Sequence, residues 1–293
     1  MFEEHAPYIA TSSPEDIIFN IIVPGFKKFG IEICVCGLSR HGFRPNYNSV
    51  TEKIDDLIRH DRNQAKTQLN GAIIFVEVNG APETFAVISA HDGFTTSVTT
   101  ESNIHKSLEQ CIANVLQHYL VQKVSLFDNF KKGVIFKDLS VIMAHPKAFQ
   151  GLVHLSAYKL KEQIKDFKNI KFIGLDARGF IFGGALAAIM GCGFVMARKK
   201  GKLPVNKGQV NPSAKYATEY SEDEVEIMNG IIKPGDKVIP IDDLIATGGT
   251  FIGVTQILNE LKAEIVAYCV IMKVDALFEI AQKKLSKPVI VIL

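Results

Sequence analysis

The sequence has no long apolar run and almost no net charge. No stretch approaches the ~18 consecutive apolar residues of a membrane span, and residues 1–7 lack the apolar core of a secretion signal. Lysine and arginine total 33 against 31 acidic residues, so the global field is too weak to attract nucleic acid or an anionic membrane surface. We therefore expect a soluble, cytoplasmic protein without nucleic-acid or membrane partners, in which any anion site is local.

Cysteine is also sparse, and its five positions form no disulfide framework. Cys34 and Cys36 suggest a metal pair, but a single residue between them in an alternating apolar run favours one face of a strand, and no second Cys or His pair has ligand spacing. The cysteines are scattered and odd in number, as reduced thiols are in a cytoplasmic protein: Cys34, Cys36, Cys111, Cys192 and Cys269.

The chain is longer than one average domain. Its 293 residues, with 47% hydrophobic content, predict two packed globular domains. Helical periodicity runs through residues 102–122, and we place the domain junction near Asn103. This gives an N-terminal domain of residues 1–103 and a C-terminal domain of residues 104–293, without internal repeats or low-complexity tracts.

Strands and helices alternate in the C-terminal domain, which predicts an open parallel sheet flanked by helices. The predicted strands are 171–175, 193–197, 236–241 and 264–272, and the predicted helices are 180–190 and 250–261. The N-terminal domain mixes the same patterns, with predicted strands 8–11 and 31–37, helices 16–29 and 51–69, and a hairpin of 72–79 and 84–89. The fold class is therefore α/β throughout.

The strongest local signal is the segment 238–250, where an apolar strand ends in two carboxylates and runs into a turn of small residues. A turn rich in Gly and Thr at a helix N-terminus presents backbone N–H groups and the positive helix end to a phosphate. Asp242 and Asp243 lie where open α/β sheets place ligands, and such a pair accepts ribose hydroxyls or holds a hydrated Mg²⁺. The alternative, a solvated helix cap, is disfavoured by the whole string.

Three further segments point to an anion site that closes. In Leu175–Gly179, a second strand-to-helix turn, the Arg178 guanidinium is able to donate two parallel hydrogen bonds to a phosphate. The basic run 198–202 follows an apolar strand, although such a run is by default a solvated face. Residues 205–225 are polar and without periodicity, and we predict a long loop that acts as an active-site lid.

Together these segments resemble type I phosphoribosyltransferases, and the string Asp-Asp-Leu-Ile-Ala-Thr-Gly-Gly-Thr is similar to that of adenine phosphoribosyltransferases. The resemblance runs from about residue 116 to the C-terminus. It implies the type I fold, a homodimer, Mg²⁺ bound with PRPP, and transfer of ribose 5-phosphate from PRPP to adenine, giving AMP and pyrophosphate. The other matching segments are 133–139, 174–183, 198–204 and 216–220.

The resemblance implies which residues bind PRPP. Asp242 and Asp243 would bind the ribose hydroxyls and reach Mg²⁺ through its bound water, and a non-proline cis peptide would fall at Asp176-Ala177. The implied 5-phosphate contacts are Ala246, Thr247, Gly248, Gly249 and Thr250, and the implied pyrophosphate contacts are Arg178, Arg198, Lys199 and Lys202. Lys200 would not contact the pyrophosphate.

The resemblance also implies which residues act on the base. Glu219 and Tyr220 would be the catalytic pair, brought over the reacting centre by the lid, where a carboxyl group manages the proton of the base. Phe136 and Leu244 would cover the two faces of adenine, although a Phe in an apolar run is more often core. Backbone groups of Ile135 and Lys137 would read the base edge.

The sequence departs from the family pattern in three places. Pro240 lies inside a predicted central strand, where a missing N–H predicts a bulge or an edge position. The stretch between Pro204 and Tyr216 is a few residues longer than in familiar members, and Ser221 stands where a Gly often follows Glu-Tyr. Lid motion is therefore less closely specified than PRPP binding.

The N-terminal domain has a weaker resemblance to inosine/xanthosine triphosphatases, through residues 9–17, 62–66 and 72–89. That family begins with Thr-Asn-x-x-Lys, whose amide and ammonium hold phosphate, and Ser13 and Asp16 occupy those two positions here. An acid in place of the cation would repel the substrate. The metal-binding Glu is likewise replaced, by Val78. We expect this domain to be inactive and to serve packing, dimerisation or regulation.

Two other functions fit part of the pattern. Some purine regulators keep the PRPP motif in a non-catalytic domain joined to a DNA-binding domain, but the basic run and Glu219-Tyr220 favour an enzyme, and the N-terminal domain lacks a basic helix. A transferase for guanine, hypoxanthine or xanthine would share the PRPP motif. Leu244 and the Phe136 segment favour adenine.

Overall fold

A computed structural model describes residues 73–77, 84–91, 93–100, 109–110, 113–114, 116–117, 120–131, 134–217 and 222–293. Side chains are described from residue 109 onward, apart from 128–136, 217 and 222. The chain divides into two compact units, Met1–Leu155 and Ser156–Leu293. The predicted domain junction near residue 103 stays a prediction.

The first unit contains two small antiparallel sheets. β1 (Ile73–Glu77), β2 (Thr84–His91) and β3 (Gly93–Thr100) form a meander in the order β1-β2-β3, which confirms the predicted hairpin and adds a third strand. β4 (Ser125–Lys131) pairs with β5 (Val134–Asp138), and α5 (Ser140–Ala144) follows. Helical positions between 109 and 122 agree with the helix predicted for 102–122. The predicted elements at 8–11, 16–29, 31–37 and 51–69 lie outside the described residues.

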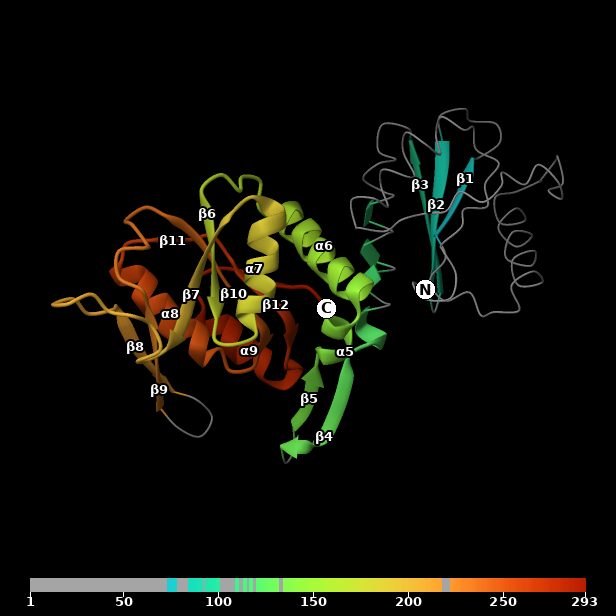
Figure 1. Cartoon of the computed structure of the whole chain (residues 1–293). Coiled ribbons are helices and arrows are strands. Elements are labelled where there is room, and N and C mark those ends of the chain that lie inside the picture. Colours follow the sequence, from blue (N-terminus) through green and yellow to red (C-terminus); the bar gives the residue numbers. More distant parts are fainter. Residues whose placement is uncertain are drawn as a thin grey trace. The chain divides into compact units, whose positions relative to one another are not determined.

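The second unit is built on one eight-stranded sheet, in the order β13-β12-β10-β6-β7-β9-β8, with β11 beside β10 (Figure 1). The strands from β13 to β7 run parallel, as predicted, and β9 and β8 extend them as an antiparallel hairpin. The strands are β6 (Ile170–Leu175), β7 (Gly193–Lys199), β8 (Ser213–Ala217), β9 (Glu222–Ile227), β10 (Lys237–Ile245), β11 (Glu264–Ile265), β12 (Tyr268–Lys273) and β13 (Val289–Val291).

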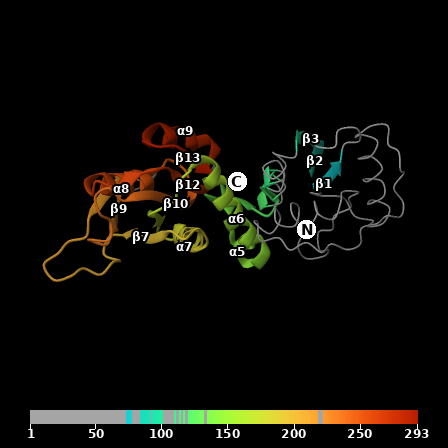
Figure 2. The same ribbon diagram turned by 90° about the horizontal axis from the view of Figure 1, so that it is seen from above.

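Helices cover both faces of this sheet. α7 (Gly179–Met190) and α9 (Asp275–Lys284) lie on opposite sides in Figure 2, and α8 (Gly249–Glu260) connects β10 to β11. In the strand order, α7 connects β6 to β7, which lies toward one edge of the sheet. α8 leads from β10 toward β12, which lies toward the opposite edge. The strand order therefore reverses between β6 and β10. In open α/β sheets the crevice at the carboxyl ends of two such strands is where ligands bind. α6 (Pro146–Gln163) precedes β6.

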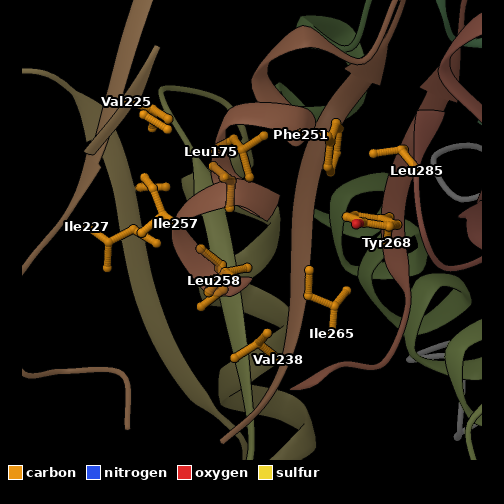
Figure 3. Close-up of a cluster of buried hydrophobic side chains, with 14 of the residues drawn as sticks. Leu175, Val225, Ile227, Val238, Phe251, Ile257, Leu258, Ile265, Tyr268 and Leu285 are labelled. Atoms are coloured by element: carbon orange, nitrogen blue, oxygen red, sulfur yellow. The ribbon is translucent and has the colours of Figure 1, made fainter. Parts of the chain in front are cut away.

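A buried apolar cluster joins α8 to the sheet (Figure 3). Phe251, Val254, Ile257 and Leu258 recur at helical spacing along α8 and are at most 2% exposed. They meet inward-facing strand residues such as Leu175, and the ring of Phe251 packs edge-on against Tyr268 at a centroid distance of 5.8 Å. Removal of this apolar surface from water is the main term that holds α8, and so the turn before it, against β10.

Three predicted elements differ from the structure. β10 runs on through Asp242 and Asp243 to Ile245 instead of ending at Ile241, and the strand predicted for 264–272 is broken into β11 and β12. Residues 205–225 are not one long loop, because β8 and most of β9 lie within them and pair with each other. Their period-two pattern is short and largely polar, so the tertiary contacts of Tyr216 and Val225 stabilise strands that the sequence alone does not indicate.

Pro240 lies in a central strand, opposite Ile173 of β6. On the other side of β10, the paired segment advances by four residues, from Ile265 to Cys269, while β10 advances by three, from Val238 to Ile241. The bulge or edge position expected at Pro240 is therefore not found, because β10 is a central strand that pairs with β6 in unbroken register from Lys237 to Ile241. The additional residue lies between β11 and β12 instead.

No helix among the described residues is long and apolar enough to cross a membrane. Of the two described cysteines, both are free, and Cys269 is buried in β12. Burial raises the pKa of the Cys269 thiol to about 12. This thiol fits the predicted reduced, structural role. Cys34, Cys36 and Cys111 lie outside the described residues.

Candidate active site

Three turns lie at the carboxyl edge of the sheet, next to the point between β6 and β10 where the strand order reverses. They are residues 176–178 after β6, 200–202 after β7, and 246–248 after β10. Because β10, β6 and β7 are adjacent and parallel, their carboxyl ends lie along one edge. The three segments in which the sequence predicted phosphate contacts are thus side by side.

The turn after β6 contains the predicted cis peptide, Asp176-Ala177, which the structure confirms. Gly179 follows at the start of α7, and it is packed so closely on β10 that an added Cβ would collide with the carbonyl oxygen of Ile241 and come within 3.2 Å of Asp242 Oδ1. Only glycine permits this approach. The close contact fixes the first turn of α7 beside the carboxylate pair.

The carboxylate pair lies on β10 among partners that hold it in place. Asp243 is 3% exposed, and its Oδ2 lies 2.8 Å from Arg178 Nε. Asp242 Oδ1 accepts a hydrogen bond from the Asp243 amide at 2.8 Å. Burial and the neighbouring Asp243 charge raise the pKa of Asp242 well above its ordinary value, and burial raises the pKa of Asp243 although Arg178 opposes the shift. Each carboxyl group of the pair therefore holds its proton more tightly than an exposed aspartate does.

The turn after β10 has the features of a phosphate cradle. Gly248 is in the left-handed conformation, with φ at 79°, and precedes the first turn of α8. The first N–H groups of a helix have no partners within it, and the helix dipole adds positive potential there. Burial raises the pKa of the Tyr216 hydroxyl on β8, and the Thr250 side chain opposes this shift. The predicted contacts Ala246, Thr247, Gly248, Gly249 and Thr250 therefore form one continuous turn.

The turn after β7 carries the basic run. Gly201 has φ at 79°, and the amide of Lys202 donates to the carbonyl of Lys199 at 3.2 Å, which closes a tight turn. Arg198 donates from Nε to Asp176 Oδ2 at 3.3 Å and from Nη1 to the Lys202 carbonyl at 3.2 Å. Its guanidinium also lies 5.8 Å from the centre of the Phe180 ring. Arg198 thereby connects the turn after β7 to the turn after β6.

Acidic side chains of β9 neutralise this run. Lys199 Nζ lies 3.2 Å from Asp223 Oδ2, and the hydrogen bond between them raises the pKa of Lys199. Lys200 Nζ lies 3.3 Å from Glu224 Oε1 and donates to Ser213 Oγ at 2.8 Å. Lys200 therefore points to the β8–β9 side, and its expected lack of a substrate contact stays a prediction.

The remaining predicted residues are distributed differently. Ile135, Phe136 and Lys137 lie on β5 in the first unit, and the side chains of Ile135 and Phe136 are outside the described part. Leu244 is half-buried on β10. Glu219 and Tyr220 fall between β8 and β9, at positions 218–221 that lie outside the described residues. Their catalytic roles stay predictions.

The carboxylate pair also bears on the metal prediction. Among the described residues no group of three or more His, Cys, Asp or Glu side chains is arranged to hold a metal ion. Asp243 Oδ2 is, however, a buried oxygen without an aligned hydrogen-bond donor in the described part of the chain. Mg²⁺ prefers one or two carboxylates together with waters and substrate phosphates. The pair fits a metal that arrives with a phosphate ligand, not a resident one.

Sequence reasoning missed two side chains that organise the site. Asp176 is the acceptor for Arg198, and Glu226 on β9 accepts two backbone N–H groups of the basic turn. No clear signal for Glu226 was present in the sequence, because it follows three other acids, at positions 222–224, in a segment whose acidic side chains are expected to be exposed. Its partners are distant in sequence, so its role is visible only in the fold.

Comparison with known proteins gives consistent matches for this region. The family described as phosphoribosyl transferase domain matches residues 139–287. The chain is 44% identical over 152 residues to an adenine phosphoribosyltransferase of Methylobacterium radiotolerans, covering 50% of this chain and 77% of that protein. It is also 44% identical over 148 residues to an adenine phosphoribosyltransferase of Clostridium botulinum, covering 50% of this chain and 81% of that protein.

Solved structures agree with these matches. The adenine phosphoribosyltransferase of Saccharomyces cerevisiae, solved with an imino-altritol bisphosphate and adenine, is 35% identical with a TM-score of 0.56, covering 61% of this chain and 99% of that one. The enzyme of Rhodothermus marinus is 31% identical with a TM-score of 0.54, covering 61% of this chain and 98% of that one. The similarity thus extends over almost the whole length of those structures.

Proposed function

Since this chain belongs to the phosphoribosyl transferase family, we propose that it transfers the ribose 5-phosphate group of PRPP to adenine, giving AMP and pyrophosphate in purine salvage. The fold is that of the type I phosphoribosyltransferases. The observation that carries the proposal is the meeting of the three turns at the carboxyl edge of β10, β6 and β7. Each turn offers groups suited to a different part of PRPP.

The phosphates of PRPP fit the two outer turns. Backbone N–H groups of Thr247 to Thr250, at the positive end of α8, suit the 5-phosphate. Arg198, Lys199 and Lys202 suit the pyrophosphate. Arg178, now paired with Asp243, completes the anion site when the ligand arrives.

The carboxylates of Asp242 and Asp243, on β10 directly before the turn proposed for the 5-phosphate, suit the ribose hydroxyls. Asp242 and Asp243 would hold Mg²⁺ bound with PRPP through its waters, and the ion would supply charge neutralisation for the departing pyrophosphate. Both carboxylates are ionised in this complex, because hydroxyl and aquo ligands donate hydrogen bonds to them.

In the transfer itself, adenine N9 forms the new bond to ribose C1′ while the bond from C1′ to the pyrophosphate oxygen breaks and its electron pair leaves with pyrophosphate. The N9 proton passes to a base, for which we propose Glu219, with Tyr220 beside it. Phe136 and Leu244 cover the faces of adenine, and backbone groups of Ile135 and Lys137 select its amino group, because an oxo group would leave a buried carbonyl unpaired.

A single assay tests this function. Purified protein is incubated with PRPP, Mg²⁺ and one of adenine, guanine, hypoxanthine or xanthine, and the nucleotide is separated by chromatography. We expect AMP from adenine and little product from the oxopurines. No nucleotide from any base, with PRPP still bound, would mean a PRPP-binding regulator instead, and preference for an oxopurine would overturn the choice of adenine.

Three broader expectations belong to this proposal. We expect a homodimer, residence in the cytoplasm and no nucleic-acid ligand. The balanced charge of 33 basic against 31 acidic residues supports the last point. Sedimentation of the full chain at micromolar concentration measures the assembly state, and a monomer that is fully active would contradict the dimer.

A further inference from the structure

Glu226 is a buried carboxylate without a role in the function proposed above. It lies on β9, is 2% exposed, and stands opposite Arg198 of β7 on one side and Ser213 of β8 on the other. Residues directly opposite on antiparallel strands place their side chains on the same face. A carboxylate this deep in a sheet costs free energy unless hydrogen bonds compensate it.

Those hydrogen bonds come from the basic turn. Glu226 Oε1 accepts from the amide of Lys202 at 3.0 Å and from the amide of Leu203 at 2.9 Å. On the other side of the turn, the Lys202 carbonyl accepts from Arg198 Nη1 at 3.2 Å. The peptide units around Lys202 are therefore held by an anion on one side and a cation on the other.

The neighbouring acids of β9 make a different kind of contact. Asp223 and Glu224 pair with the side chains of Lys199 and Lys200, which are exposed and rotate freely once released. Among the described acids of β9, Glu226 is the one whose side chain accepts hydrogen bonds from backbone N–H groups of the turn. Asp223 and Glu224 thus neutralise charge, whereas Glu226 fixes the path of the chain.

We propose that Glu226 is a positioning residue for pyrophosphate: by fixing the Lys202 and Leu203 amides, it aims Arg198, Lys199 and Lys202 at the pyrophosphate of PRPP. This inference rests on the proposed function. Charged groups bind a phosphate well only when their geometry is set before the ligand arrives, and a displacement of ~1 Å costs up to ~100-fold. The effect is therefore specific to ligands that contain pyrophosphate.

The test compares ligands with and without pyrophosphate. KM is measured for PRPP and adenine in the forward reaction and for pyrophosphate and AMP in the reverse reaction. In Glu226→Ala we expect the KM values for PRPP and pyrophosphate to rise about tenfold or more, while those for adenine and AMP stay within about twofold. In Glu226→Gln, whose amide oxygen accepts the same two N–H groups, all four should stay within about threefold of wild type.

Glu224→Ala is the matched control, because Glu224 lies two residues away on the same strand and its carboxylate contacts the side chains of Ser213 and Lys200 but no backbone N–H group of the turn. It should leave all four constants near wild type. If Glu226→Ala changes all four equally, or none, the positioning role is wrong. If that variant does not fold, Glu226→Asp keeps the charge, is one methylene shorter and should show the same selective rise.

Calorimetric titration with Mg²⁺ and PRPP separates this proposal from the function on which it rests. If the wild type binds PRPP but makes no nucleotide, the transferase function fails while the loss of PRPP affinity in Glu226→Ala still supports positioning. If the wild type makes AMP and Glu226→Ala binds PRPP as tightly, the positioning role alone fails.

Discussion

At the scale of single residues, the carboxylate pair is held in a state that suits its ligand and not its own stability. Asp242 and Asp243 are adjacent in sequence and share β10, so each is exposed to the charge of the other. Arg178 offsets part of this cost for Asp243. Groups with shifted pKa values at the carboxyl edge of a sheet are typical of ligand sites.

Replacement of Asp242 by Asn should stabilise the protein at neutral pH. The raised pKa means that the folded chain binds this proton more tightly, so the stability contribution is complete below the ordinary pKa of ~4 and is lost as the pH rises through the raised folded value. The amide of Asp242→Asn carries no charge at any pH. Thermal unfolding should therefore show a higher midpoint than wild type at pH 7.5, with the difference vanishing at acid pH.

The same substitution should weaken PRPP binding, because an amide accepts ribose hydroxyls less strongly than a carboxylate. Asp243→Asn should do the same. Wild-type affinity for PRPP, measured by titration calorimetry, should fall on acidification at a pH above ~4. A wild-type affinity that is flat from pH 8 to pH 5 would contradict the raised pKa of the pair.

Glu219 should matter for turnover more than for binding. A base that accepts the N9 proton acts in the transition state, and loss of such a group costs ~10²- to 10⁴-fold in rate. Glu219→Ala should therefore lower kcat by about 100-fold while the KM for PRPP changes little, as steady-state kinetics would measure. Glu222→Ala is the control, since it removes a nearby acid of the same segment. An unchanged kcat in Glu219→Ala would remove this residue from the catalytic role.

At the scale of elements, α8 connects the phosphate cradle to the β8–β9 hairpin. Gly253, one turn into α8, lets the helix and the hairpin meet: an added Cβ would come within 2.9 Å of the Tyr216 ring and 3.2 Å of Val225. Tyr216 and Val225 therefore pack directly against α8, one turn from its start. The β8–β9 hairpin is thus anchored beside the turn that precedes α8.

Gly253→Ala should loosen this contact and destabilise the fold. Overpacking of a close helix contact costs ~1–3 kcal/mol, which exceeds the ~1 kcal/mol that alanine gains over glycine in helix propensity. Gly184→Ala in α7 is the matched control, because no atom lies within 4 Å of its added Cβ. Denaturant unfolding should show a loss for Gly253→Ala and a gain of up to ~1 kcal/mol for Gly184→Ala. Equal gains in both variants would contradict the close packing at Gly253.

The elements of the second unit were largely predictable because their signals are local. Apolar runs with glycine at their ends gave β6, α7, β7 and α8 nearly to the residue. The β8–β9 hairpin was mistaken for a loop because the buried positions in it, such as Ala214, Tyr216, Val225 and Ile227, are separated by charged residues and are short of a clear pattern. The break between β11 and β12 was not predictable, because the residues on both sides of it belong to one continuous apolar run.

At the scale of the whole molecule, the family match and the proposed site leave the first part of the chain without a counterpart. The solved relatives cover 61% of the chain, and the family match begins at residue 139. The proposed binding and catalytic residues lie between Ile135 and Thr250. The transfer reaction therefore should not require the N-terminal residues chemically.

A chain beginning at residue 104 should keep a kcat/KM for PRPP within about threefold of the full chain, because no proposed contact is removed. Circular dichroism checks that it folds. A folded but inactive truncation would contradict the prediction and would give residues 1–103 a part in the reaction. An unfolded truncation would assign them to the folding of the first compact unit, which extends to Leu155, and would contradict the predicted junction near residue 103.

The N-terminal residues should not hydrolyse nucleoside triphosphates. Ser13 and Asp16 stand where the resembling triphosphatases have an amide and a cation, and an acid there repels phosphate. The full chain with Mg²⁺ and ITP or XTP should release no more pyrophosphate than buffer does, as a coupled phosphate assay would measure. If the wild type releases pyrophosphate and Asp16→Lys releases it at the same rate, the proposed repulsion of phosphate by Asp16 is wrong.

The sequence by itself determined the α/β class, the order of the main strands and helices, and the glycine-containing turns at the strand ends. It did so because a strand that ends in Asp-Asp and a glycine turn is a local, physically restricted pattern. The cis peptide at Asp176-Ala177 was implied by the family resemblance, and the structure confirms it.

Only the tertiary structure decided which charges meet. Arg178 reaches Asp243, Arg198 reaches Asp176, and Glu226 reaches the Lys202 amide across pairs that are distant in sequence. Such partnerships depend on strand order and register, which place β9 against β7 and β10 against β6. Charge interactions depend on distances of a few ångströms and carry no periodicity. The sequence therefore predicted roles for Arg178, Arg198 and Asp243 but did not indicate which charged groups pair with one another.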